Sequence, residues 1–184
     1  MNEKSVVSAL KDDGWFCKKD DVGDFYCVKD FSGISVRVIP CVRHFSGKFS
    51  ISLMPSLSVD AFSQAVRYIF GKGGSYTPLI VGDQGVVDLD EILASDILQL
   101  AEQAVSWALA QDIEVGLAAY RNLPTTAKGA MPLRHLAALA VAGDVARLEY
   151  YCKSFEQGDR LGFVPYITSE MLDRAIEVAK QHQA

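Results

Sequence analysis

The sequence changes character partway along the chain, and this change constrains the fold more than any single motif. Residues 14–57 consist of short segments of alternating polarity separated by Gly, Asp and Ser, whereas seventeen of the twenty alanines lie at positions 89–184. A run of strand patterns followed by a run of helix patterns is typical of proteins in which strands and helices are segregated. We therefore expect an α+β fold.

Four strands are predicted in the first part, at residues 15–18, 25–29, 34–42 and 48–54. The last has the clearest pattern, because Phe49, Ile51 and Leu53 alternate with polar neighbours. The connections between the segments are short, which favours antiparallel pairing of consecutive strands. The sequence therefore predicts a four-stranded antiparallel β-meander packed against helices, the first of which spans residues 3–12.

The remainder of the chain predicts helices and one small hairpin. After a helix at 58–70, residues 79–87 read as a hairpin turning at 82–84, and Asp88 opens a long helix that ends near residue 110. Further helices are expected at 112–120, 133–157 (a helical pair) and 168–180. We expect a sheet-and-helix core over residues 1–112 and an α-helical C-terminal extension over 113–184. The extension is expected to pack on the same core, which leaves a single domain possible.

Composition and charge narrow the classes of function. The chain has 184 residues, of which 49% are hydrophobic and 22% charged, as in ordinary soluble globular proteins. Its formal charge is −5 and its basic residues are scattered, which disfavours nucleic acid as a partner. No apolar run reaches membrane-spanning length, and the N-terminus lacks the apolar segment of a secretory signal. We expect a cytoplasmic protein with no membrane partner.

The four cysteines show no spacing typical of metal sites. Cys17, Cys27 and Cys41 fall in predicted strands, and Cys152 falls in a predicted helix. Free cysteines in such places usually behave as small buried hydrophobic residues, and cytoplasmic thiols are kept reduced. We expect reduced thiols. The alternative is a disulfide between Cys17 and Cys27, which face each other if the first two strands form a hairpin.

Motifs for catalysis, cofactors or metals are missing from the sequence. The glycine-rich segment 70–78 follows a predicted helix, whereas a phosphate-binding loop lies between a strand and a helix. No GxSxG occurs, and His44 and His135 lack partners at ligand spacing. We expect no metal and no cofactor. Whether the protein is an enzyme stays open at this stage, with a non-catalytic role favoured.

Candidate binding residues gather at the ends of the predicted strands. Asp20, Asp21 and Asp24 form an acidic turn suited to a basic partner. Phe31 and Phe45 fall in predicted turns, where an exposed aromatic side chain can anchor a partner. Next to Phe45 lie two further candidates, Arg43 and His44. We expect these seven residues to contribute to a partner-binding surface, although turn formation and solubility also explain the acidic residues.

Three functions fit these observations. The first is a non-catalytic bacterial protein-binding protein, most concretely an immunity-type inhibitor that neutralises a toxin by direct binding. The second rests on the order helix, strands, helix, two short strands, helix over residues 3–110. This order resembles that of type III secretion chaperones, which are small, acidic and usually dimeric. The third is an enzyme or small-ligand binder whose site combines Arg43 and His44 with acidic residues from 83–96. The oligomeric state stays open.

Overall fold

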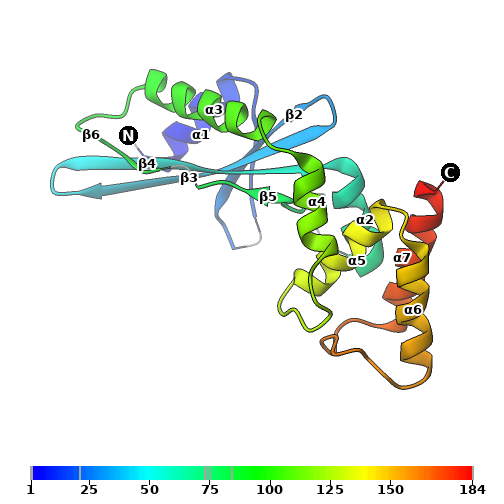
Figure 1. Ribbon diagram of the computed structural model, residues 1–184. Coiled ribbons are helices and arrows are strands. Elements are labelled where there is room, and N and C mark those ends of the chain that lie inside the picture. The colour runs from blue at the N-terminus through cyan, green and yellow to red at the C-terminus, as the bar shows by residue number, and fades with distance from the viewer. Residues whose placement is uncertain (1, 21, 73, 75, 84, 184) are drawn as a thin grey trace. The chain divides into compact units, whose positions relative to one another are not determined.

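The computed structural model describes residues 2–20, 22–72, 74, 76–83 and 85–183. Two compact units make up the chain: unit 1 contains residues 1–58 and 80–111, and unit 2 contains residues 59–79 and 112–184. Both are drawn in Figure 1. The fold is mixed α+β, as the sequence predicted. Residues 59–79, which we expected in the sheet-containing part, belong with the C-terminal helices.

Unit 1 is an antiparallel sheet with two helices. Its elements are α1 (Glu3–Asp12), β1 (Phe16–Lys19), β2 (Phe25–Phe31), β3 (Ile34–Phe45), β4 (Lys48–Val59, whose last residue is assigned to unit 2), β5 (Ile80–Val81), β6 (Val87–Leu89) and α3 (Ala94–Leu109). The strand order is β1-β2-β3-β4-β5, and β6 also pairs with β4. The first four strands follow one another as predicted, but the sheet holds five or six strands rather than four.

The segment from β5 to β6 corrects the expected hairpin. β5 pairs with β4 through Ser56↔Val81, and β6 pairs with the same strand through Ile51↔Val87. Both are antiparallel to β4, so they run in the same direction and cannot form a hairpin with each other. β5 and β6 are therefore two short strands that pair with different parts of β4. Gln84, at the expected turn, lies outside the described residues.

Gly82 shows why this edge requires a glycine. Its amide donates a hydrogen bond of 2.9 Å to the carbonyl oxygen of Pro55. A Cβ atom added to Gly82 would lie 2.7 Å from the indole ring of Trp107, which belongs to α3. Contacts this short do not occur between real side chains, so only glycine allows the edge strand and the helix to approach so closely.

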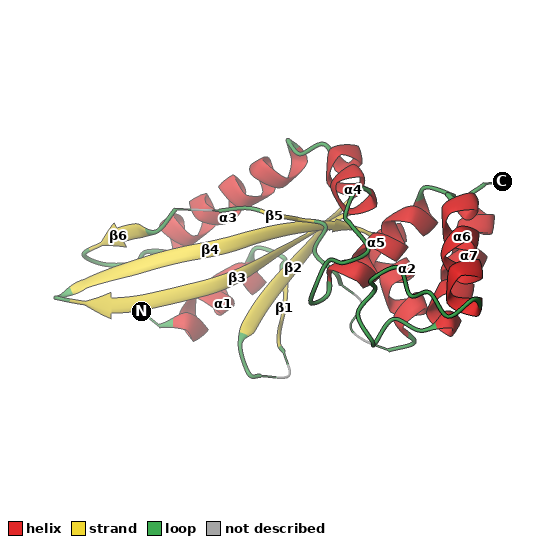
Figure 2. Cartoon of the chain, turned by 60° about the horizontal axis from the view of Figure 1, so that its bottom comes forward, coloured by secondary structure: helices red, strands yellow, loops and turns green. Residues whose placement is uncertain are grey.

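The core of unit 1 lies between the sheet and the two helices. Val6, Val7 and Leu10 are the buried residues of α1, and α3 buries Ile97, Leu100, Ala101, Ala104 and Ala108. The two helices contact each other and both contact β3, which places them on the same side of the sheet. In Figure 2 the strands pass in front of both helices. The α3 helix begins at Ala94 rather than at Asp88, because the Asp96 carboxylate caps it by accepting from the Leu93 amide at 2.8 Å.

Cys17 and Cys27 form a disulfide, which corrects the expectation of four reduced thiols. The two residues are direct partners in the β1–β2 ladder, and the bond joins the short edge strand β1 to β2. This is the hairpin alternative that the sequence left open. Cys41 and Cys152 are free thiols.

Unit 2 is helical. Its helices are α2 (Asp60–Phe70), α4 (Ile113–Arg121), α5 (Met131–Val141), α6 (Val145–Glu156) and α7 (Ser169–His182). Helix α5 is apolar nearly all round and contacts each of the other four, so it forms the centre of this unit. Gly143, with a φ of +69°, allows the sharp turn from α5 to α6, and Asp144 then caps α6 by accepting from the Arg147 amide.

Candidate binding face of the sheet

The sheet of unit 1 has one face that carries neither of the unit's helices. Side chains alternate between faces along a strand, and directly paired residues point to the same side. Val36, Val38, Ile51 and Leu53 are fully buried on the side of α1 and α3. Their intervening neighbours therefore lie on the opposite side. We call this side the open face and define it by seven residues: Phe16, Lys18, Tyr26, Val28, Arg37, Ile39 and Met54.

The open-face residues come from four neighbouring strands of the sheet, β1 to β4, and ladder pairs between β1, β2 and β3 join five of them directly. Phe16 pairs with Val28, which pairs in turn with Arg37, and Lys18 pairs with Tyr26. Paired side chains of neighbouring strands are close enough to touch. The open face is therefore a contiguous surface, although its residues are spread over almost forty positions of sequence.

Large apolar side chains are exposed on the open face. Phe16 is 60% exposed and Met54 is 47% exposed, while Tyr26, Val28 and Ile39 are half-buried. Contiguous exposed apolar surface on a protein marks interaction sites more often than isolated exposed residues do. Phe16 and Tyr26 were not among the binding residues predicted from the sequence, so this surface is a finding of the structure.

Two cations of the open face stack on its aromatic rings. The ammonium group of Lys18 lies 4.6 Å from the centre of the Phe16 ring, and the guanidinium group of Arg37 lies 4.2 Å from the centre of the Tyr26 ring. Stacking of this kind holds each cation against an aromatic surface. The result is a surface that combines apolar area with positive charge.

This positive charge is unusual for its surroundings. Unit 1 contains eight Lys and Arg against thirteen Asp and Glu, whereas unit 2 contains ten of each, so the whole net charge of −5 belongs to unit 1. None of the seven open-face residues is acidic. The acidic residues that continue this side along the chain are Asp20 and Asp24, two residues beyond Lys18 and Tyr26, and Asp30, which accepts from the Ser35 hydroxyl at 2.6 Å. The seven defining residues thus include two cations and no carboxylate, with acidic residues next to them in sequence.

The sequence predicted a different set of seven binding residues, and two of these extend the open face. Arg43 and Phe45 have the same strand parity as Arg37 and Ile39, and they lie where β3 continues beyond β2 toward the β3–β4 turn (Figure 1). Phe45, predicted in a turn, is the last residue of β3 and is 80% exposed. His44 has the opposite parity. Its ring packs against Phe49, with the ring centres 4.7 Å apart.

The remaining predicted residues lie elsewhere. The Asp20 carboxylate accepts hydrogen bonds from the amides of Val22 and Asp24, at 3.1 and 2.9 Å, so it shapes its own turn. Asp24 is exposed, and Asp21 lies outside the described residues. Phe31 is the last residue of β2, next to the β2–β3 turn, where it pairs with Ile34 and is half-buried. The seven predicted residues therefore do not form one surface, and their contribution to binding stays a prediction.

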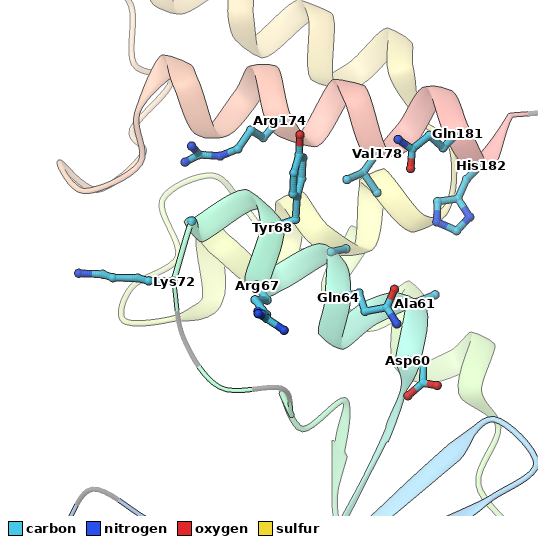
Figure 3. Close-up of a pocket in the computed structure, with 12 residues that line it drawn as sticks. Asp60, Ala61, Gln64, Arg67, Tyr68, Lys72, Arg174, Val178, Gln181 and His182 are labelled. Atoms are coloured by element: carbon cyan, nitrogen blue, oxygen red, sulfur yellow. The ribbon is translucent and has the colours of Figure 1, made fainter.

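Unit 2 contains a groove between α2 and α7 (Figure 3). It has a volume of about 1110 Å³ and is lined by Asp60, Ala61, Gln64, Ala65, Arg67, Tyr68, Gly71, Lys72, Arg174, Val178, Gln181 and His182. Arg174 is engaged inside the unit, because its Nε donates to the Ile69 carbonyl and its Nη1 pairs with Glu170. The Tyr68 hydroxyl donates to the Glu177 carboxylate at 2.5 Å, and this bond raises the pKa of Tyr68. His44 does not line this groove.

The titratable groups buried in unit 2 have structural partners. His135 is fully buried; its Nδ1 lies 2.9 Å from the Tyr120 carbonyl oxygen and its Nε2 lies 3.1 Å from the Tyr151 hydroxyl. The carbonyl can only accept, so Nδ1 carries the proton and Nε2 accepts from Tyr151. The Tyr151 oxygen in turn accepts from the Nε of Arg147 at 2.9 Å. Burial lowers the pKa of His135, which keeps the ring neutral.

Two searches of the described residues bear on other classes of site. Within them, His, Cys, Asp and Glu nowhere form a group of three that could hold a metal ion. Likewise, every helix traced in the structure is too short or too polar to span a bilayer.

Comparison with known proteins gives one match. Neither a curated protein nor a solved structure matches the chain. A family model does, over residues 2–180, and its description reads "Family of unknown function (DUF6990)". Because the match covers nearly all of the 184 residues, the chain belongs to the DUF6990 family.

Proposed function

We propose that the chain is a non-catalytic protein-binding protein that binds its partner through the open face. The observation that carries this proposal is the exposure of Phe16 and Met54 beside stacked cations on a sheet face that α1 and α3 leave uncovered. Aromatic residues and Arg are the side chains most enriched among those that dominate the energy of protein interfaces. The open face contains aromatic residues and an Arg.

The apolar part of the open face is large enough to matter energetically. Full burial of one large apolar side chain contributes about 1.5–3 kcal/mol. Phe16 and Met54 retain about half of their surface in the isolated chain, and Phe45 retains more. Covering these three side chains would contribute on the order of 3–5 kcal/mol before the costs of association. That is enough to make the face the energetic centre of an interface.

In its most concrete form, the proposal is an immunity-type inhibitor of a toxin in the bacterial cytoplasm. Such a protein needs a complementary surface that excludes water from its target and needs no catalytic group of its own. The features that favour this form are the exposed aromatic residues and the separation of charge between the open face and the rest of unit 1.

A secretion chaperone is the second candidate, and the order of elements along residues 3–109 favours it. The elements follow the order helix, strands, helix, two short strands, helix over residues 3–109, which resembles that of type III secretion chaperones. The contacts of α1 and α3 leave the other sheet face to a secreted partner. Helices α4–α7 are additional to this pattern.

The experiment is a capture assay with matched variants. Tagged wild-type protein is used to isolate its stoichiometric partner from the native lysate, and the purified partner is then titrated against Phe16→Ser and Met54→Ser. Val115→Ser is the control, because Val115 is 65% exposed but lies on α4 in unit 2. We expect each open-face variant to weaken binding about tenfold or more, and the control to bind like wild type. Equal binding by all of them would refute the proposal.

The partner's state separates the two candidates. An immunity-type inhibitor forms a complex with a folded toxin and abolishes its activity. A secretion chaperone binds a segment of its partner that stays extended, and deletion of that segment abolishes capture. Limited proteolysis of the complex and an activity assay of the partner, with and without this protein, distinguish the two outcomes.

A further inference from the structure

The Cys17–Cys27 disulfide joins β1, the outermost strand of the open face, to β2. We propose that this bond is a redox-sensitive lock. Its reduction releases β1 from the edge of the sheet and thereby lowers the affinity of the open face for its partner. The effect on binding rests on the proposed function, whereas the release of β1 is a property of the chain alone.

The disulfide involves the one side chain of β1 that is not exposed. This strand has four residues and lies at the edge of the sheet, where it contacts β2 and α1. The side chains of Phe16, Lys18 and Lys19 are exposed, and that of Cys17 is half-buried. The Cys17 sulfur lies 4.0 Å from the carbonyl oxygen of Val7, which belongs to α1. Without the disulfide, β1 is held by its ladder to β2 and by surface contacts, and segments of this kind open most readily.

The position of β1 decides whether the open face is complete. Phe16 and Lys18, two of the seven residues that define the face, lie on this strand. Phe16 is the most exposed apolar residue of the seven, at 60%. Both residues pair with β2, and the Cys17–Cys27 pair lies between their two pairs in the ladder. Opening of the β1–β2 ladder would therefore remove both side chains from the face.

A dithiol, or two monothiol molecules acting in turn, reduces the bond in a balanced reaction. A thiolate of the reductant attacks the Cys17 sulfur, because Cys17 is half-buried whereas Cys27 is fully buried. The S–S bond breaks, Cys27 leaves as a thiolate and takes up a proton, and a mixed disulfide forms at Cys17. A second thiolate attacks the reductant's sulfur in this mixed disulfide, and Cys17 leaves as a thiolate that also takes up a proton. The protein gains two electrons and two protons, and the reductant is oxidised to a disulfide.

The cytoplasm, where we propose that the chain acts, contains such reductants. Glutathione and thioredoxin keep cytoplasmic thiols reduced, and disulfides that form there are usually transient or redox-sensing. A bond on an edge strand, with one sulfur half-buried, is more accessible to exchange than a bond enclosed in a core. Cys41, a free thiol, has the strand parity of Arg37 and lies on the open side of the sheet, so the sheet separates it from the bond. Reduction therefore requires an external thiol.

Alkylation followed by mass spectrometry measures the redox state of the intact protein. The folded protein is incubated with dithiothreitol, or with reduced glutathione in about hundredfold excess over glutathione disulfide, and thiols are then trapped with N-ethylmaleimide. We expect most molecules to become alkylated at Cys17 and Cys27 in both buffers. A bond that stays intact in the folded protein and opens only in urea would overturn the inference, because structural disulfides resist the glutathione pool.

Hydrogen–deuterium exchange of the oxidised and the reduced protein tests the release of β1. We expect the amides of residues 16–19 to exchange at least about tenfold faster after reduction, while exchange in α3 and β4 stays unchanged. Cys17→Ala should show the fast exchange in both conditions, and Cys152→Ser, which removes a free thiol of unit 2, should behave like wild type. Chemical reduction of the wild type keeps the test valid if Cys17→Ala folds poorly. Equal exchange in β1 before and after reduction would overturn the inference.

Binding of the captured partner separates this inference from the proposed function. We expect reduction to weaken binding by the wild type about tenfold or more. Binding by Cys17→Ala should not change on reduction, which also controls for effects of the reductant on the partner. If Phe16→Ser loses the partner while oxidised and reduced wild type bind equally, the proposed function stands and the redox-sensitive lock fails. If Phe16→Ser binds like wild type while reduction still releases β1, the proposed function fails and the release of β1 stands.

Discussion

The buried histidine of unit 2 supports a quantitative prediction about stability. Tyr151→Phe removes the one hydroxyl that joins the Nε2 of His135 to the Nε of Arg147. The phenylalanine ring keeps the packing against Phe163, whose centre lies 5.2 Å from that of Tyr151. The variant therefore leaves the shape of the core unchanged and tests the polar contact alone.

The expected loss of stability follows from the polar groups that lose a partner when the Tyr151 hydroxyl is removed. His135 is fully buried, so without Tyr151 its Nε2 becomes a buried acceptor with no donor, which costs about 1–3 kcal/mol. Arg147 keeps its bond to the Arg121 carbonyl at 3.1 Å, so the guanidinium group is not left without partners. We expect the free energy of unfolding to fall by about 2 kcal/mol.

The assay is urea denaturation followed by circular dichroism at the helical band. Trp15 and Trp107, the two tryptophans of the chain, both belong to unit 1, so their fluorescence reports separately on the sheet-containing unit. Tyr150→Phe is the matched control, because Tyr150 is the neighbouring tyrosine but is 58% exposed. A loss below about 0.5 kcal/mol for Tyr151→Phe, or one equal to that of Tyr150→Phe, would refute the assigned network.

Three further predictions follow from other contacts. Burial holds the pKa of His135 below its ordinary value of 6.5, so the unfolded chain binds a proton at His135 more readily than the folded chain does. Unit 2 should therefore keep full stability above pH 6.5 and lose stability as the pH falls through the lowered pKa. Urea midpoints at pH 7.5 and 5 would measure this loss, and His135→Gln should reduce the difference between the two midpoints. Gly82→Ala should destabilise unit 1 by about 1–3 kcal/mol in tryptophan-monitored unfolding, because its Cβ would collide with Trp107; an unchanged midpoint would contradict this contact. Burial and the neighbouring Asp173 raise the pKa of Cys152 to about 11. Iodoacetamide should therefore modify Cys152 at a rate at least roughly tenfold lower than that of an unhindered thiol. Equal rates, measured by mass spectrometry, would contradict this environment for Cys152.

The local patterns of the sequence predict much of the secondary structure. Alternation at Phe49, Ile51 and Leu53 locates β4, and the short turns give the order of the first four strands. The glycines and polar residues at 82–85 suggest a hairpin, but the pairing of β5 and β6 with β4 is non-local. A turn pattern cannot distinguish a connection between two strands that pair with the same neighbour from a reversal of the chain.

The candidate site was harder to predict because it depends on which face the helices cover. Phe16, Tyr26 and Val28 are apolar, as core residues are, and nothing local separates them from Cys27 or Val36 on the other side. Strand parity does contain a usable signal: Lys18 and Arg37 share a face with these residues, whereas a fully covered face would exclude both cations. The same parity separates Arg43 and Phe45 from His44, which the sequence analysis grouped together.

Hydrogen–deuterium exchange of the chain, alone and bound to its captured partner, tests the central claim most directly. We predict that the partner protects the amides of β1, of β2 and of residues 34–41 of β3, and leaves exchange in α2 and α7 unchanged. Protection confined to the α2–α7 groove or to the outer surfaces of α1 and α3, with β1 to β3 unchanged, would contradict the assignment of the open face as the binding surface.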